Sequence, residues 1–382
     1  MEQSTLPSPS AIPIPGLLLD VQAVLSVLSV AVLLLCANPD GRANGQVLRP
    51  ELQINLGSYS NPAKPGQPDT AGTIYTTSSD ETLGYFRDKG FRTLRLPVNW
   101  ERLQPEACGP FDKAKLAELG DYLDRIQKAG FRIIIDLHAF GGRDGHQLGS
   151  KELPTDALAD FWTRLIRHIP GRFAGYDIMN EPHDMPDPSA WPEAAQKTVD
   201  AIRKIDRTTT ILVEGDDWSN AGRWMHANAG LDIKDPAKRL VYSAHLYFDQ
   251  DTSGLYKRPW EQERPRPDIA AERLRPFLDW LRTKGFRGHI GEAGVPGDHP
   301  GWLQVLERFL VEVTDGADVL TGCAYWAGGD WTDSWNLTVQ PVADGKRADR
   351  PQMPLLARYI KLRGGNDAPW RPSAFRLRSD GS

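Results

Sequence analysis

The chain has 382 residues, of which 40% are hydrophobic and 25% charged, the composition of a folded globular protein. Its net charge of -5 argues against a nucleic-acid-binding protein, which would carry a basic surface, and we expect no nucleic-acid partner. Three cysteines without a Cys-x-x-Cys pair exclude a disulfide framework and a structural zinc site, and allow at most one disulfide.

The first 45 residues differ from the rest and are predicted to be a hydrophobic leader followed by a polar linker. Residues 17–36 are apolar apart from Asp20, Gln22 and two serines, and 23–36 has the length of a signal-peptide hydrophobic region. A basic segment before it is missing. We therefore expect an exported protein, extracellular or periplasmic. The sequence leaves open whether the segment is cleaved or retained as a membrane tether. Residues 46–382 are expected to form one domain.

From residue 78 onward an amphipathic helix, a glycine and a short apolar run recur in that order. Residues 89–92, 129–132 and 284–287 all end in Gly-Phe-Arg, and a glycine there can adopt the left-handed conformation that closes a helix. Ser78 and Glu81 predict a capping box for the first helix. Apolar spacing predicts further helices around 116–126, 158–169, 195–205, 274–281 and 303–313.

The apolar runs after these helices are short and do not alternate, which is typical of parallel strands covered on both faces. Eight such strands are expected, at 52–56, 93–97, 132–137, 174–179, 209–213, 240–245, 288–291 and 322–326. Strands and helices that alternate over this length predict an α/β fold, a single (β/α)8 TIM barrel. An open doubly wound sheet is the alternative, but no glycine-rich phosphate loop follows the first strand.

Polar residues stand where the predicted strands end, and a TIM barrel builds its active site at that face. They are Arg95, His138, Asn180, Glu181, Glu214, Asp216, His245, Tyr247, Glu292 and Trp326. We interpret Glu214 as a structural residue of the barrel rim. Trp100, Trp218, Trp331 and Trp335 fall in the loops after strands and are candidates for stacking on sugar rings.

Two of these strand ends carry a glutamate in a distinctive setting. One buried strand runs into Asn180-Glu181-Pro182, and another into Gly291-Glu292-Ala293-Gly294. Two carboxyl groups that face one cleft are what glycoside hydrolysis requires: one protonated to protonate the leaving oxygen, the other ionised to attack the anomeric carbon. A retaining enzyme should place them about 5 to 5.5 Å apart, and a gap near 8 Å would indicate inversion.

At these residues the chain resembles glycoside hydrolase family five, the cellulase family, over most of residues 50–360. The phrases that carry the resemblance are Arg95-Leu96-Pro97, Trp100 to Pro105, Ile135 to His138, Asn180 to His183, Ala244 to Tyr247, Gly291 to Gly294 and Tyr325-Trp326. The resemblance implies that Glu181 is the acid/base, Glu292 the nucleophile and Trp326 the floor of a sugar subsite. It implies substrate-binding roles for Arg95, His138, Asn180, His245 and Tyr247.

The chain departs from the family pattern at Ala293 and at residues 139–142, which puts the substrate in doubt but not the mechanism. We expect a retaining endo-β-1,4-glucanase that acts on a polysaccharide or oligosaccharide as a monomer, without a cofactor or metal ion. Two alternatives stay open: the same chemistry on mannan, mixed-linkage glucan or an exopolysaccharide, and a barrel that binds polysaccharide without turnover. Endo or exo action is not decided.

Overall fold

The structure is a computed structural model that describes residues 42–43, 46–47, 49–62, 67–266, 268–330, 332, 334–342 and 347–363. The predicted leader at 1–45 therefore lies almost wholly outside the described residues, as do the proposed cleavage or anchor segment 17–36 and Trp331. Strands β1 (Arg42–Ala43) and β2 (Gln46–Val47) pair antiparallel, where we expected the end of the linker and the start of the domain.

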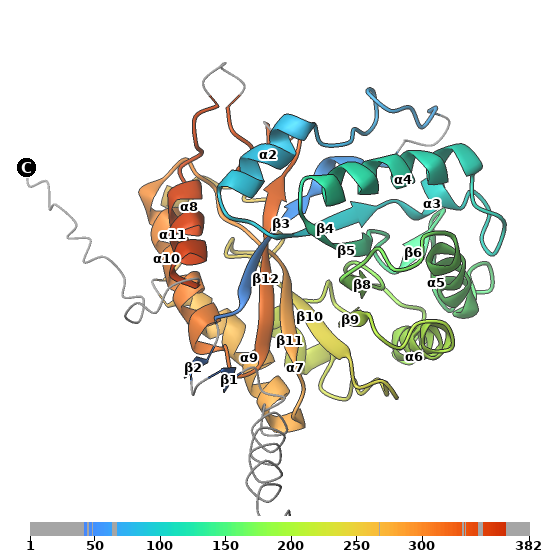
Figure 1. The fold of residues 1–382 in the computed structure, drawn as a ribbon. Coiled ribbons are helices and arrows are strands. Elements are labelled where there is room, and N and C mark those ends of the chain that lie inside the picture. Colours follow the sequence, from blue (N-terminus) through green and yellow to red (C-terminus); the bar gives the residue numbers. More distant parts are fainter. Residues whose placement is uncertain are drawn as a thin grey trace, which may run out of the picture. The chain divides into compact units, whose positions relative to one another are not determined.

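Residues 49 onward contain a closed barrel of eight parallel strands in the order β10-β11-β12-β3-β4-β5-β8-β9 (Figure 1). The strands are β3 (Glu51–Leu56), β4 (Thr93–Val98), β5 (Arg132–Leu137), β8 (Gly175–Asp177), β9 (Thr210–Glu214), β10 (Leu240–Leu246), β11 (Gly288–Ala293) and β12 (Leu320–Gly328). Because the sheet closes on itself, the open doubly wound alternative is wrong and the (β/α)8 prediction is confirmed.

Helices surround the strands in Figure 1 and bury their apolar faces on them. They are α2 (Asp80–Asp88), α3 (Trp100–Leu103), α4 (Lys113–Lys128), α5 (Asp156–His168), α6 (Ala190–Arg203), α7 (Trp224–Ala227), α8 (Trp260–Glu263), α9 (Ile269–Lys284), α10 (Pro300–Asp315) and α11 (Met353–Arg363). The turns η1 (Gly57–Tyr59) and η2 (Ala221–Arg223) and the hairpin of β6 (Gly142–Arg143) with β7 (His146–Gln147) lie in loops. Of the helices in the described ranges, none is both long and apolar enough to span a membrane.

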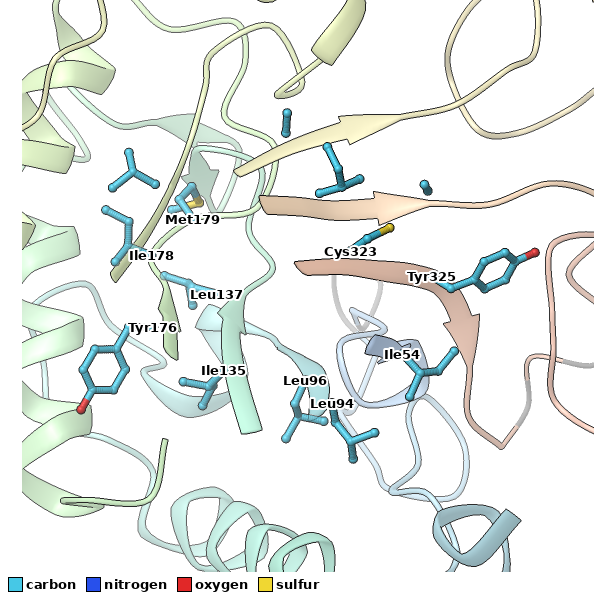
Figure 2. Packing of buried hydrophobic residues seen from close by; sticks show 14 of the residues in the cluster. Ile54, Leu94, Leu96, Ile135, Leu137, Tyr176, Ile178, Met179, Cys323 and Tyr325 are labelled. Atoms are coloured by element: carbon cyan, nitrogen blue, oxygen red, sulfur yellow. The ribbon is translucent and has the colours of Figure 1, made fainter. Parts of the chain in front are cut away.

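Alternate residues of each strand separate the outer core from the barrel interior. Leu94 and Leu96 on β4 and Ile135 and Leu137 on β5 are buried members of the apolar core between strands and helices (Figure 2). Arg95, between the two leucines, contacts side chains of five other strands and therefore lies inside the barrel. The interior of this barrel is thus polar where the strands end.

Two details of the sequence prediction are wrong. The helix cap is Ser79, whose side chain accepts from the Thr82 amide, and not Ser78, whose own amide instead donates to Tyr122. Residues 174–179 were expected as one strand, but the regular ladder of β8 ends at Asp177. The extended path continues nonetheless, because Asn180 still donates to Leu137 O at 2.9 Å.

A buried ion pair joins helix α6 to the segment that precedes β10. Arg203, at the end of α6, binds both carboxylate oxygens of Asp235 at 2.8 and 3.0 Å, and the two side chains are 2% and 3% exposed. The same guanidinium donates to the carbonyl oxygens of Asp206 and Thr209, just before β9. Burial opposes ionisation of Asp235, but the bonds from Arg203 and two backbone amides lower its pKa.

We expect the substitution Asp235→Ala to destabilise the fold by about 3 to 5 kcal/mol, because it leaves the Arg203 guanidinium buried and unpaired. Urea unfolding should show a lower midpoint with an unchanged slope. Asp232→Ala, which removes an exposed pair with Lys234, is the control and should cost less than about 1 kcal/mol. Since the pKa of Asp235 is lowered on folding, its contribution is full above the unfolded pKa and is lost as the pH falls through the folded one. Equal losses in both variants would contradict this account.

Candidate active site

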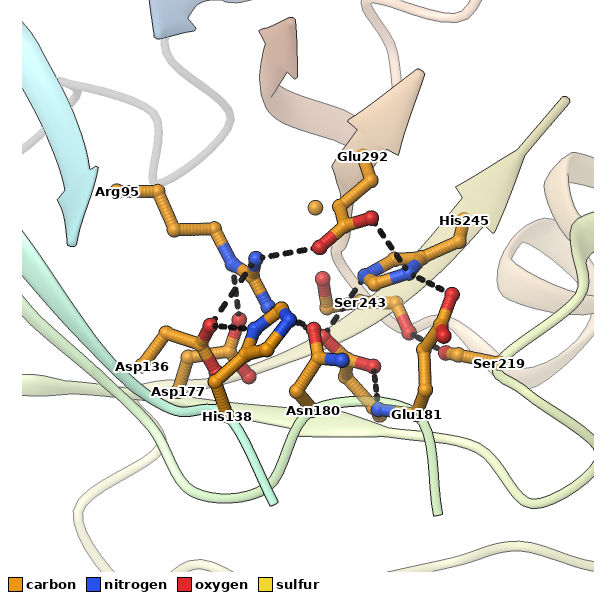
Figure 3. Close-up of polar contacts among 12 residues, drawn as sticks. Arg95, Asp136, His138, Asp177, Asn180, Glu181, Ser219, Ser243, His245 and Glu292 are labelled. Carbon is orange, nitrogen blue, oxygen red and sulfur yellow. Dashed lines mark hydrogen bonds and ion pairs between the residues drawn. The ribbon is translucent and has the colours of Figure 1, made fainter. Parts of the chain in front are cut away.

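The guanidinium of Arg95 is the centre of the polar network at the strand ends (Figure 3). Its side chain is fully buried, yet it makes contacts of 2.8 to 3.2 Å with groups from β3, β5, β8, β9, β11 and the segment after β8. The partners are Asn55, Asp136, Asp177, Asn180, Glu214 and Glu292. Burial alone would lower its pKa, but the surrounding carboxylates raise it well above the ordinary value, so Arg95 stays charged.

His245, at the end of β10, joins two carboxyl groups. Its Nδ1 lies 2.7 Å from Glu181 Oε1, and its Nε2 lies 2.9 Å from Glu214 Oε1. Burial disfavours the imidazolium, but the charges of Glu214 and Glu292 and the bonds to Glu181 and Glu214 raise the pKa of His245 well above 6.5. His245 is therefore protonated at neutral pH and donates from both nitrogens.

Glu181 is held in a different electrostatic state from its neighbours. Burial raises its pKa above the ordinary value, although the bond from His245 opposes the rise, and Glu292 and Glu214 add to it. Glu214 is buried more completely, with its side chain 0% exposed against 15% for Glu181, but His245 and Arg95 lower its pKa, so it remains ionised. The amide of Glu181 donates to Glu214 Oε2 at 2.7 Å, while its own backbone is left-handed at φ 44°.

Glu292, at the end of β11, faces Glu181 across the cleft. Arg95 donates to its Oε1 at 3.0 Å and the hydroxyl of Tyr247 donates to its Oε2 at 2.7 Å. Burial and the charge of Glu292 raise the pKa of Tyr247 well above 10, so the phenol keeps the proton that it donates. One carboxyl oxygen of Glu181, one of Glu292 and one ring nitrogen of His245 all lie within 4.8 Å of one another.

The side-chain amide of Asn180 is oriented by Arg95, and its Nδ2 donor has no partner among the described residues. Its Oδ1 accepts from Arg95 at 2.9 Å, which turns the Nδ2 away from the guanidinium. That nitrogen is buried and has no hydrogen-bond partner in the described part of the chain. An unsatisfied buried donor is costly, and a ligand hydroxyl beside Glu181 would satisfy it.

Aromatic side chains line two neighbouring cavities beside the site. His138 stacks on Trp326 with ring centres 5.5 Å apart, and Trp326 stacks on Trp335 at 5.8 Å. These three rings line a cavity of about 430 Å³, and Trp218, which is 43% exposed, lines another of about 870 Å³. His183 borders both cavities. Flat exposed rings along a cleft are suited to stacking on sugars.

The structure brings together all eight site residues expected from the sequence. Six of them are linked directly by hydrogen bonds or ion pairs, and His138 joins them through Asp136, which it contacts at 2.8 Å. Trp326 joins through its stack on His138.

Two expectations about neighbouring residues are corrected, and two residues of the network were not predicted. Glu214 is not a rim residue: it is fully buried and binds Arg95, His245 and the amide of Glu181. Trp100 does not face the cleft, because it is fully buried and its indole donates to Gln104. Asp136 and Asp177 were missed, although a charged residue inside an apolar strand signals a buried partner.

One group of three side chains in the described residues could in principle hold a metal ion: Glu181, His245 and Glu292. Metal binding requires a neutral imidazole, whereas the pKa of His245 is raised well above 6.5. Glu292 is also engaged by the guanidinium of Arg95, whose positive charge would repel a cation. The arrangement therefore suits proton transfer better than metal binding.

Comparison with known proteins agrees with this geometry. Residues 56–327 match the family model described as Cellulase (glycosyl hydrolase family 5). Endo-beta-1,4-glucanase B of Emericella nidulans is 31% identical over 283 residues, 72% of this chain and 81% of that protein. The structure of endoglucanase Cel5A from Pseudomonas stutzeri with cellobiose is 37% identical, with a TM-score of 0.75 over 83% of this chain and 93% of that chain. An endo-beta-1,4-glucanase from Xanthomonas axonopodis pv. citri is 33% identical, with a TM-score of 0.75 over 82% and 99%. The chain therefore belongs to glycosyl hydrolase family 5, the cellulase family of glycoside hydrolases.

Proposed function

We propose that this protein hydrolyses β-1,4-linked glucan with net retention, with Glu181 as general acid/base and Glu292 as nucleophile. The observation that carries the proposal is the close approach of the two groups, whose oxygens lie within 4.8 Å. Retaining glycosidases separate their carboxyl groups by about 5 to 5.5 Å, whereas inverting enzymes leave about 6.5 to 9.5 Å for a water molecule.

The electrostatics support the same division of roles. The raised pKa of Glu181 keeps a proton available for the leaving glycosidic oxygen, while Arg95 and Tyr247 donate hydrogen bonds to the two oxygens of Glu292 and orient it. Glu292 attacks the anomeric carbon as the bond to the leaving oxygen breaks and Glu181 gives that oxygen its proton. Glu181 then removes a proton from water, which attacks the same carbon and releases Glu292.

Substrate binding is assigned from the groups that remain free around this pair. The Nδ2 of Asn180 is placed to donate to a sugar hydroxyl beside the reacting carbon, a bond that strengthens in the transition state. Trp326 and His138 offer a stacking surface, and Phe140 joins His138 to Trp218 of the neighbouring cavity. The glucan substrate is favoured by the relatives named as endo-beta-1,4-glucanases and by the cellobiose complex of the Pseudomonas enzyme.

We expect the full chain to release reducing sugars from carboxymethyl cellulose, and Glu292→Gln to lower kcat by about 10³-fold or more, because the amide cannot attack the sugar. Glu106→Gln, on the exposed loop after β4, is the matched control and should keep full activity. The first product anomer, followed by NMR, should be β.

Several outcomes would contradict this. Equal activity in the wild type and Glu292→Gln would exclude the assigned nucleophile, and an α product would exclude retention. Inactivity on cellulose with activity on mannan, mixed-linkage glucan or an exopolysaccharide would overturn the substrate alone. Binding of these polymers without product from any of them would favour a non-catalytic barrel.

The raised pKa of Glu181 predicts the alkaline limb of the pH profile. Glu181 must be protonated when the leaving oxygen departs, so kcat/KM should fall as the pH rises through a pKa that burial has raised above 4.5. A dinitrophenyl β-cellobioside needs no proton on its leaving group, and its alkaline limb should move to higher pH or vanish. An unchanged limb with that substrate would assign the titration to another group.

We further propose that residues 46–382 are the catalytic domain and that residues 1–45 direct export. The N-terminus of the protein recovered from a host that exports it should lie beyond residue 36, in the periplasm or culture fluid. Full-length protein in the membrane fraction would indicate a tether instead of cleavage, and full-length soluble protein in the cytoplasm would contradict export.

A further inference from the structure

A loop outside the catalytic network packs directly on the tyrosine that contacts Glu292. The loop of residues 249–256 begins three positions after the end of β10. Gly254 in this loop has a φ of 72°. A methyl group added at Gly254 would lie 2.9 Å from Cδ1, Cδ2 and Cε1 of Tyr247. Equal distances to both sides of the ring mean that Gly254 directs its Cβ position at the face of the ring. Only a glycine can approach the ring this closely.

The loop is held in this position by a buried carboxylate. Asp249 is 1% exposed, and its Oδ1 accepts from the Gly254 amide at 3.1 Å. Its Oδ2 accepts from the Ser253 hydroxyl at 3.0 Å and from the Tyr256 amide at 3.1 Å. Arg273 of α9 donates to the carbonyl oxygens of both Tyr247 and Asp249, so one side chain holds the backbone of the tyrosine and the backbone of the loop.

The far end of the loop reaches the strand that carries Glu292. The hydroxyl of Tyr256 donates to the carbonyl oxygen of Gly294 at 2.6 Å, two residues after Glu292, and accepts from the Phe248 amide at 3.0 Å. The ring of Tyr256 is buried against Trp302 of α10, with ring centres 4.8 Å apart. One loop therefore touches Tyr247 and the backbone two residues after Glu292.

We propose that residues 249–256 form a clamp that fixes the Tyr247 hydroxyl on Oε2 of Glu292, with Gly254 and Asp249 as positioning residues for the reaction. This rests on the proposed role of Glu292 as nucleophile. The clamp acts by fixing the position of Tyr247, because its residues contact Tyr247 and Gly294 and neither Glu181 nor Glu292. It fixes the phenol on one oxygen of the carboxylate while Arg95 holds the other.

The decisive variant is Gly254→Ala, compared with Gly171→Ala. Gly171 has φ of 71°, so its substitution imposes the same backbone strain, but no atom lies within 4 Å of the added methyl group. We expect Gly254→Ala to lower kcat by roughly 10- to 100-fold, the effect of a misplacement near 1 Å. Gly171→Ala should keep the wild-type kcat even if both variants lose thermal stability.

The split between kcat and KM separates positioning from general damage. A phenol displaced from Oε2 of Glu292 leaves Asn180, His138 and Trp326 where they are, so Gly254→Ala should lower kcat while KM stays near the wild-type value. Tyr247→Phe should lower kcat in the same way, and Gly254→Ala added to Tyr247→Phe should produce little further loss, because the two act through one contact.

The clamp and the proposed function fail in distinguishable ways. A wild type that is silent on every β-glycan tested would refute the glycosidase assignment before any variant is compared. An active wild type with equal kcat in Gly254→Ala and Gly171→Ala would overturn the clamp, as would losses that multiply in the double variant. If Gly254→Ala does not fold, Asp249→Asn tests the same loop, and an unchanged kcat in that variant would refute the proposal.

Discussion

The site depends on one buried cation. Removing Arg95 from water is costly by several kcal/mol, and the barrel offsets this by directing carboxylates at the guanidinium from strands β5, β8, β9 and β11. Each partner stands at an inward strand position, so a one-residue register shift would turn it away from Arg95. The strand register and the geometry of the site are therefore fixed together. Any other register would leave the charge of Arg95 buried without its carboxylate partners.

The same crowding sets the protonation states that the chemistry needs. Five carboxyl groups share the interior with two cations, Arg95 and protonated His245, and so many negative charges are not stable together. The pKa of Asp177 rises with burial and with the charge of Glu214, and that of Glu181 rises mainly with burial. Glu214 lies between His245 and Arg95 and stays ionised. A proton on Glu181 beside ionised Glu214 thus follows mainly from the burial of Glu181, to which the charges of Glu292 and Glu214 add.

The barrel and its two glutamates could be predicted from the sequence, because short apolar runs and helical spacing are local signals. Strand ends share one face of a barrel, so their positions in the sequence are enough to predict that Glu181 and Glu292 lie close together. The roles of Glu214, Asp136 and Asp177 could not be read in this way, since they depend on which inward residues Arg95 reaches across the barrel. The clamp was equally out of reach, because nothing local links Gly254 to the ring of Tyr247.

The loops above the strands are strained, and the charge network is what holds them. Glu181 has φ of 44°, and Asp217, Trp218 and Ser219 have consecutive φ values of 60°, 59° and 52°. Such residues cost about 1 to 3 kcal/mol each and persist only where their surroundings fix them. Here Glu214 accepts from the Glu181 amide, and the carbonyl oxygens of Pro182 and Ser219 accept from Trp218 and His245. Glu214, whose charge raises the pKa of Glu181, therefore also holds the Glu181 backbone, so a change at Glu214 should disturb both.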